Sequence, residues 1–134
     1  MDATDAEVAW LAGLLEGEGS FLAVRRKRDG AVLPRISMTT TDRDIIDRVV
    51  ALMGGSVSEI RRPNKKVAWG WAVGSFAHVE YWMTRLYPHM GARRRQQIDV
   101  VLNARPWGAN TKRSAVIAKS WASGNRANRR KVAP

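Results

Sequence analysis

Apolar positions near the start of the chain recur three and four residues apart, the spacing of a helix with one buried face. The positions that follow this spacing are Val8, Leu11, Ala12, Leu14 and Leu15. Thr4 or Asp5 can cap such a helix at its beginning, and Gly17 and Gly19 break the pattern. The spacing therefore predicts a helix over residues 6–16.

Further along, apolar positions alternate with polar ones, as they do in strands with one buried face. Residues 20–28 and 31–40 alternate in this way on either side of Asp29-Gly30, a dipeptide typical of two-residue hairpin turns. Pro34 lacks a backbone N–H, so it indicates a strand edge or an irregular strand start. These residues predict a first β-hairpin.

A second hairpin is predicted over residues 56–62 and 66–73, around a turn at residues 63–65. Its second strand alternates between large apolar and small residues, so one face of the strand is expected in the core. The residues on that face are Trp69, Trp71 and Val73.

Helical spacing returns in residues 42–53, 75–87 and 93–103, and a short helix around residues 112–121 is a further option. The order helix, two strands, helix, two strands, helices predicts an α+β domain of the type α-β-β-α-β-β-α. We expect a four-stranded antiparallel sheet that is covered by helices on one face and open on the other.

The positive charge of the chain is concentrated at its end. The 134 residues carry a formal net charge of +11, and residues 105–134, with eight basic and no acidic side chains, contribute +8 of it. We expect residues 1–104 to form one domain and residues 105–134 a basic extension, partly helical or disordered. A solvated tail that aids solubility would explain the extension alone. A second basic cluster at residues 25–28, inside the domain, favours a nucleic acid as partner.

Composition excludes several classes of protein. The chain has no cysteine, which excludes a disulfide scaffold, a zinc ribbon and a thiol nucleophile, and its only histidines are His78 and His89. No apolar run reaches the roughly 18–20 residues of a membrane span, and the acidic start lacks the basic region of a signal peptide. We therefore expect a cytoplasmic protein with no membrane partner and no small-molecule substrate.

The segment most informative about function is residues 11–19, Leu-Ala-Gly-Leu-Leu-Glu-Gly-Glu-Gly. Gly13 and Gly17 are four apart and share a helix face, so two helices can approach there until their backbones touch. Glu16 and Glu18 lie at the helix end, where the helix dipole disfavours carboxylates unless a cation binds. The alternative is a helix cap followed by a bend, with Glu18 as a solvated turn residue.

These nine residues resemble the signature of the LAGLIDADG homing endonucleases, and Ser20-Phe21 continue the resemblance. The predicted element order agrees with that family over residues 6–104. The resemblance implies a site-specific endonuclease that cuts both strands of a long pseudo-palindromic DNA site and starts the homing of its own intron or other coding element. It also implies metal-dependent phosphodiester hydrolysis that leaves short 3′ overhangs and 5′ phosphates.

Family members with one copy of the motif act as homodimers, and this chain has one copy. The residues implied at the contact between two copies are Leu11, Gly13, Leu14 and Gly17. The resemblance makes Glu18 and the backbone carbonyl of Gly17 the metal ligands, while Glu16 is expected to be structural. Mg²⁺ is the expected cofactor, with Mn²⁺ able to substitute, because close like carboxylates need a cation between them. Glutamate stands at both acidic positions where the family name has aspartate, which changes the reach of the ligand.

Two further catalytic residues are implied by the resemblance. A basic residue near the scissile phosphate corresponds to residues 93–95, with Arg94 as the best candidate for electrostatic stabilisation. A solvated run at a helix start is the alternative for these arginines. A polar residue that positions water falls at the end of the second strand, at Thr40 or Thr39.

The open sheet face is expected to bind double-stranded DNA. Strand alternation directs Phe21 and Ala23 to the core and their neighbours to the groove. The candidates for DNA contact are Ser20, Leu22, Val24, Arg26, Arg28, Arg35, Ser37, Thr39, Arg61, Arg62 and Lys66. Arg26 and Arg28 are candidates for reading guanine edges. Others hold phosphates or are ordinary solvated residues.

Other functions remain open on the same scaffold. A catalytically silent DNA-binding regulator would be marked by loss of the motif carboxylate, and Glu18 is present. An intron maturase would bind structured RNA through a basic surface, and RNA and DNA affinities would separate it from a nuclease. A ribosome-associated basic protein is disfavoured by the carboxylate pair.

Overall fold

A computed structural model describes residues 3–108 of the chain. The expected short helix at residues 112–121 and most of the basic extension lie outside the described residues. Each helix and strand expected up to residue 103 is present and in the predicted order, so the α+β prediction is confirmed. The elements are α1 (Asp5–Glu18), β1 (Gly19–Arg25), β2 (Val32–Thr40), α2 (Arg43–Met53), β3 (Ser56–Ile60), β4 (Ala68–Val73), α3 (Phe76–Leu86), the 3₁₀ turn η1 (Tyr87–His89) and α4 (Ala92–Asn103).

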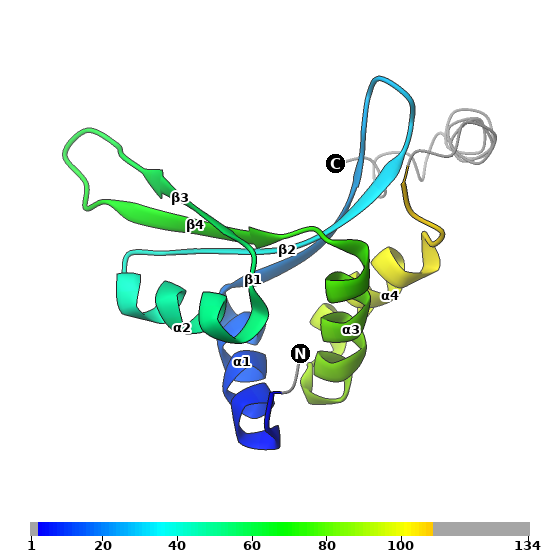
Figure 1. Ribbon diagram of the computed structural model, residues 1–134, viewed down its shortest axis with the longest axis horizontal. Coiled ribbons are helices and arrows are strands. Elements are labelled where there is room, and N and C mark those ends of the chain that lie inside the picture. Colours follow the sequence, from blue (N-terminus) through cyan, green and yellow to red (C-terminus); the bar gives the residue numbers. More distant parts are fainter. Residues whose placement is uncertain (1–2, 109–134) are drawn as a thin grey trace.

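The four strands form one antiparallel sheet in the order β1-β2-β4-β3. β2 pairs with β4 only from Ile36 to Thr40, so beyond this region each hairpin continues as a separate two-stranded ribbon. Such ribbons twist strongly. Figure 1 shows the two hairpins as the arms of an open V, with the helices beneath them.

Pro34 lies in one of these ribbons, two residues before the pairing of β2 with β4 begins. Its missing N–H therefore interrupts no hydrogen bond between those two strands. The strand-edge prediction is confirmed locally, although β2 is a central strand in the sheet order.

The core lies between the sheet and the helices. The alternation predicted for β4 is confirmed, because Trp71 and Val73 are buried and Trp69 packs against the core. The Trp71 indole N–H donates to the Gly54 carbonyl at 2.8 Å, so this side chain also ties β4 to the end of α2. Other large core side chains are Leu11, Leu15, Ile36, Ile46, Met53, Trp82, Leu86 and Ile98.

The packed chain extends past the expected domain end at residue 104. The Trp107 side chain is buried, and its indole N–H donates to the Val101 carbonyl at 3.0 Å. Gly108 pairs with Val32 in an isolated bridge, with 2.9 Å between the Gly108 nitrogen and the Val32 oxygen. The chain therefore stays packed against the domain as far as Gly108, with Trp107 in the core.

The two ends of helix α1 are formed differently. Thr4 forms a capping box with Glu7, so the predicted cap at Thr4 is confirmed. At the other end Gly17 stays helical and the helix runs to Glu18, two residues beyond the predicted end. None of the helices within residues 3–108 combines the length and the apolar composition needed to cross a membrane.

Leu11 is a test of the core assignment, because it has no exposed surface. Replacing it with alanine leaves a cavity, so Leu11→Ala is expected to lower the free energy of unfolding by about 2–5 kcal/mol. Urea denaturation followed by tryptophan fluorescence at fixed protein concentration measures this change. Ala6→Ser, on the exposed side of α1, is the control, expected within about 0.5 kcal/mol. A loss below about 1 kcal/mol for Leu11→Ala would contradict its place in the core.

Candidate nucleic-acid interface

The concave side of the V is the sheet face that the helices leave uncovered. Alternate residues of β1 and β2 point to it, because their neighbours Phe21, Ile36 and Met38 are buried against the helices. The register places Ser20 opposite Ser37 and Leu22 opposite Arg35. The remaining predicted residues with this strand parity are Val24 and Thr39. The alternation predicted from the sequence therefore agrees with the burial of both strands.

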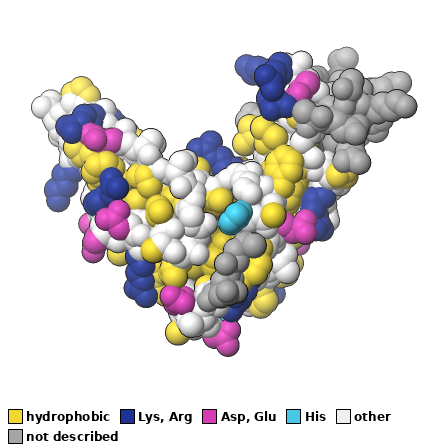
Figure 2. All heavy atoms as spheres, in the orientation of Figure 1, with side chains coloured by type: hydrophobic (Ala, Val, Ile, Leu, Met, Phe, Trp, Pro, Cys, Tyr) yellow, Lys and Arg dark blue, Asp and Glu magenta, His cyan; other side chains and the backbone are white. Residues whose placement is uncertain are grey.

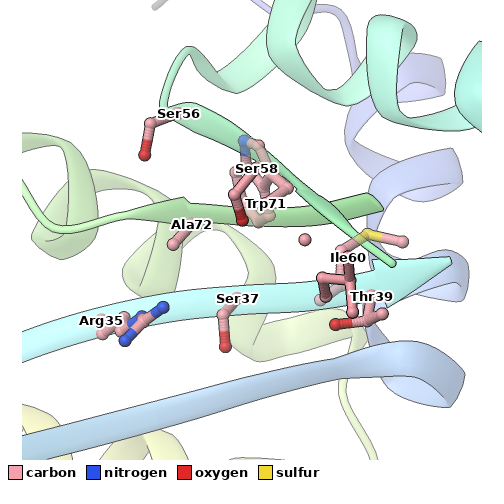
Figure 3. Close-up of a pocket in the computed structure, with 10 residues that line it drawn as sticks. Arg35, Ser37, Thr39, Ser56, Ser58, Ile60, Trp71 and Ala72 are labelled. Atoms are coloured by element: carbon pink, nitrogen blue, oxygen red, sulfur yellow. The ribbon is translucent and has the colours of Figure 1, made fainter. Parts of the chain in front are cut away.

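A hollow of about 220 Å³ opens on this face between β2, β4 and β3. Figure 3 shows Arg35, Ser37 and Thr39 in a row along β2, with Ser56 and Ser58 on β3 across β4. The register pairs two small β4 residues with this row, Ala72 with Ser37 and Gly70 with Thr39. The floor is therefore shallow and rich in hydroxyl groups, and a bulky ligand can approach its backbone closely.

Sequence reasoning missed the β3 and β4 residues of this hollow. Two of them could have been predicted from the sequence, because Trp69, Trp71 and Val73 in the core require Gly70 and Ala72 on the opposite face of β4. The parity of β3 depended on its register, which pairs Ser58 with Gly70 and Ser56 with Ala72. The hollow's remaining lining residue on β3 is Ile60.

The basic residues of the second hairpin lie in its loop and not in its strands. β3 ends at Ile60 and β4 begins at Ala68, so the predicted contacts Arg61, Arg62 and Lys66 are exposed at the end of that arm. Arg61 is ion-paired with Glu59. Figure 2 shows Lys and Arg side chains near the free ends of both arms.

In the first hairpin, Arg26 organises the turn. Its Nε and Nη2 donate to the two carboxylate oxygens of Asp29 at 3.1 and 2.7 Å, and the Ala31 N–H donates to Asp29 Oδ1 at 3.0 Å. The Arg26 side-chain hydrogen bonds, followed by the bond from Ala31, lower the pKa of Asp29 to about 2. The Arg26 guanidinium is thus engaged within the turn, whereas the predicted contact Arg28 is exposed.

The two acidic residues of the motif have different surroundings. Glu16 Oε1 accepts a hydrogen bond from the Gly91 N–H at 2.5 Å, and Glu16 Oε2 lies 3.8 Å from Arg94 Nε. The Glu18 side chain is exposed, and within residues 3–108 it makes no hydrogen bond or ion pair. Glu16 therefore joins the end of α1 to the start of α4, while the Glu18 carboxylate is available to a ligand.

The strand register also decides between the two candidate threonines. Gly19 pairs with Met38 as the first pair of the β1–β2 register, so Glu18 and Thr39 each lie one residue beyond that pair, and Thr39 is exposed on the open face. Thr40 has the parity of the buried residues Ile36 and Met38, and its hydroxyl accepts from the Asp42 N–H at 3.2 Å. Of the two candidates, Thr39 faces the open side of the sheet, whereas the Thr40 hydroxyl is engaged at the start of α2.

Arg94 is buried and already held by partners within the protein. Its residue is only 7% exposed, its Nε donates to the Glu16 carbonyl at 3.0 Å, and its Nη1 donates to Gln97 Oε1 at 3.0 Å. Arg95 is engaged with the carbonyls of Tyr87 and Pro88. The burial and partners of Arg94 argue against a direct contact with a scissile phosphate. Arg93 and Arg95 are both exposed, and of these Arg95 is engaged by the two carbonyls.

The predicted interface residues of α1 divide into two groups. Leu11 is fully buried in its own core, which leaves it no surface to offer a second copy. Gly13 and Gly17 are exposed, and a Cβ added at either one would meet no atom within 4 Å. Leu14 is half-buried and packs against the core from the side.

The chemistry of the motif fits part of a site for a hard cation. Carboxylate and carbonyl oxygens are the ligands that Mg²⁺ prefers, and Glu18 and Gly17 supply one of each at the exposed end of α1. No group of three or more acidic or histidine side chains within residues 3–108 is placed to hold a metal ion. A single copy of this domain therefore offers only one free motif carboxylate.

Comparison with known proteins identifies the fold. No protein-family model and no curated protein sequence matches the chain. Among solved structures, the archaeal intron-encoded homing endonuclease I-Vdi141I, complexed with DNA, is 21% identical, with a TM-score of 0.58 over 75% of this chain and 69% of that one. The homing endonuclease I-CvuI, in complex with its target and Ca, is 21% identical, with a TM-score of 0.57 over 74% of this chain and 65% of that one.

A third similar structure is described by the name of the motif. The LAGLIDADG homing endonuclease I-GzeII, in complex with its DNA target, is 16% identical, with a TM-score of 0.62 over 98% of this chain and 43% of that one. This chain thus spans less than half of I-GzeII and about two thirds of I-CvuI. The chain has the fold of the LAGLIDADG homing endonucleases, as its sequence predicts.

The Arg26–Asp29 contact predicts a shifted acid titration. Because the pKa of folded Asp29 is below its ordinary value of 3.8, ionised Asp29 stabilises the hairpin above that value, and this contribution is lost as the pH falls toward about 2. In Arg26→Ala, the pKa of Asp29 is expected to rise toward 3.8, as measured by NMR titration of its carboxyl carbon. Arg28→Ala is the control with a smaller expected rise, since Arg28 acts only through charge. An unchanged Asp29 pKa in Arg26→Ala would contradict this account of the turn.

Proposed function

We propose that this chain, with the fold of the LAGLIDADG homing endonucleases, is a site-specific DNA endonuclease that acts as a homodimer. The observation that carries the proposal is the exposed, unpaired Glu18 carboxylate at the end of α1, where the motif helix meets the open sheet face. The proposal is supported by the arginines and hydroxyl groups on that face and by the DNA-bound structures that share the fold.

The substrate we propose is duplex DNA lying in the V. The arms offer exposed cations near their ends, in Arg28, Arg61, Arg62 and Lys66, which suit phosphates on either side of a duplex. Arg35 stands beside the hydroxyl-lined hollow and is the candidate for a guanine contact in the major groove. Ser20, Leu22, Val24, Ser37 and Thr39 complete the surface that would face the base pairs.

The proposed reaction is hydrolysis of one phosphodiester bond on each strand. Glu18 and the Gly17 carbonyl would hold Mg²⁺, or Mn²⁺ in its place, which when bound activates water and stabilises the leaving oxygen. Thr39, which follows Met38, the register partner of Gly19, would orient the attacking water. Arg93, exposed at the start of α4, would contact the scissile phosphate in place of the buried Arg94. The proposed cut is staggered and leaves 3′ overhangs and 5′ phosphates, as the family resemblance implies.

The homodimer is proposed because a single domain supplies only one free motif carboxylate. The exposed Gly13 and Gly17 leave a helix face without side-chain bulk, on which a second copy of α1 can pack closely. Such packing would bring the two Glu18 carboxylates toward one another. Two like charges at short range then require divalent cations between them.

A cleavage selection on randomised duplex DNA with Mg²⁺ tests the nuclease, with Glu18→Gln beside the wild type. We expect defined ends from a pseudo-palindromic sequence, no cutting with EDTA, and a rate at least about 100-fold lower in Glu18→Gln, because a metal ligand contributes several kcal/mol to the transition state. Glu80→Gln alters an exposed carboxylate paired with Arg105 and is the control expected to cut normally.

The other outcomes of this selection point to the competing functions. Enrichment of a duplex by binding without any cutting would overturn the nuclease and support a DNA-binding regulator. Neither cutting nor enrichment, together with tighter binding of structured RNA than of duplex DNA, would support a maturase. Equal cutting by Glu18→Gln and the wild type would exclude Glu18 as the metal ligand.

The dimer is tested by adding bulk to the exposed face of α1. Gly13→Leu meets no atom of its own chain at the Cβ, so the protomer is expected to fold, while the close approach of two helices is blocked. We expect the dimer dissociation constant to rise at least about tenfold, or 1.4 kcal/mol, in analytical ultracentrifugation. Thr84→Leu places the same side chain on the exposed side of α3 and should leave the dimer intact. A Gly13→Leu protein that dimerises like the wild type would contradict the proposed contact.

A further inference from the structure

We propose that Arg94 and Glu16 form a positioning pair that fixes the end of the motif helix, and that Glu18 depends on this pair for its orientation. The inference rests on the proposed function for its catalytic consequence, while its structural consequence can be tested without that function. It gives the buried arginine of α4 a role that differs from contact with a phosphate.

The pair joins two segments that are far apart in the sequence. Arg94 Nε donates to the Glu16 backbone oxygen at 3.0 Å and lies 3.8 Å from the Glu16 carboxylate. The same carboxylate accepts the Gly91 N–H at 2.5 Å. One residue of α1 is thus held through both its main chain and its side chain by the beginning of α4.

The electrostatics of α1 explain why an arginine is needed there. The helix ends in two glutamates and has no basic residue in its own last turn, although the negative end of a helix dipole favours cations. Arg94 supplies the missing positive charge from α4, where it also occupies a carbonyl of the last turn. Because Arg94 is only 7% exposed, its charge is poorly hydrated and depends on these partners.

Gly91 leaves the space that this arrangement requires. A Cβ at residue 91 would lie 3.2 Å from Glu16 Oε1, closer than an ordinary contact. The φ of Gly91 is −74°, a value that every residue adopts, so the requirement is for room and not for glycine's backbone freedom. An added methyl group would therefore push the Glu16 carboxylate away from the start of α4.

The consequence for Glu18 follows from its distance along the chain. It is two residues beyond Glu16, and its own side chain has no partner within residues 3–108. Its position is therefore set by the backbone between the fixed Glu16 and the first residue of β1. If Glu16 is released, the proposed metal ligand loses the anchor nearest to it, and misplacement by about 1 Å can cost of the order of 100-fold in rate.

Amide hydrogen exchange on the full chain tests the structural half of the inference. In Arg94→Gln, exchange at residues 16–19 is expected to become at least about tenfold faster relative to the β2–β4 core. Arg95→Gln is the matched control, because Arg95 is the next residue of α4 and its side chain contacts η1, through the Tyr87 and Pro88 carbonyls and the Tyr87 ring. Equal exchange at residues 16–19 in the two variants would overturn the inference, whether or not the wild type cuts DNA.

Metal binding and cleavage test the functional half. Titration with Mn²⁺ followed by electron paramagnetic resonance, and single-turnover cleavage of the selected duplex, are expected to weaken about 10- to 100-fold in Arg94→Gln. Duplex affinity is expected to stay within about threefold of the wild type, since Arg94 is buried away from the DNA. Arg94→Lys keeps the charge without the fork of donors and should regain only part of the loss. Unchanged Mn²⁺ affinity and cleavage in Arg94→Gln would overturn the role in positioning Glu18.

Gly91→Ala keeps the test available if Arg94→Gln fails to fold. It retains both charged partners and is expected to show the same pattern in milder form, with faster exchange at residues 16–19 and a several-fold loss of Mn²⁺ affinity. Wild-type behaviour of Gly91→Ala in both measurements would contradict the inference. If the wild type cuts no DNA but the exchange differs as expected, the nuclease proposal fails while the anchoring of α1 stands.

Discussion

The short pairing of β2 with β4 is the constraint on which the rest of this molecule depends. It runs only from Ile36 to Thr40, and it joins two hairpins that would otherwise be independent. On one side of this junction, alternate residues bury Ile36, Met38 and Trp71 against the helices. On the other side, the same alternation leaves a shallow polar floor. One strand register therefore determines both which residues enter the core and which residues line the open face.

The fold could be read from the sequence because its signals are local and agree with each other. Helical spacing and the alternation of Trp69, Trp71 and Val73 each specify a short segment without reference to the rest. Asp29-Gly30 marks the first hairpin correctly, but the two-residue turn is wrong, because β1 ends at Arg25 and β2 begins at Val32. The errors fall at the ends of elements, where tertiary contacts decide. Gly17 remains helical and the chain passes directly from Glu18 into β1, while Trp107 joins the core although the helical pattern stops before it.

The residues of the candidate site could be predicted where the alternation of a strand decides which face a side chain lies on. They could not be predicted where the position of a side chain depends on which hydrogen-bond partners lie near it in the fold. Leu22, Arg35, Ser37 and Thr39 follow from the period of two alone. The surroundings of Arg94 depend on how the start of α4 meets the end of α1, two segments separated by most of the domain, and no sequence pattern encodes that contact. Arg26 likewise has an acidic neighbour three residues away, and only the geometry of the turn shows that the two are joined.

The arms of the V extend beyond the junction as two-stranded ribbons whose concave faces bear few core contacts. Leu22, on such a face, is 43% exposed, and its replacement removes little buried surface from the domain. Mutations can therefore accumulate on these faces with small effects on folding, while the junction and the motif helix tolerate few. The architecture separates the residues that can diversify from those that cannot, which allows new recognition surfaces to evolve on an unchanged scaffold.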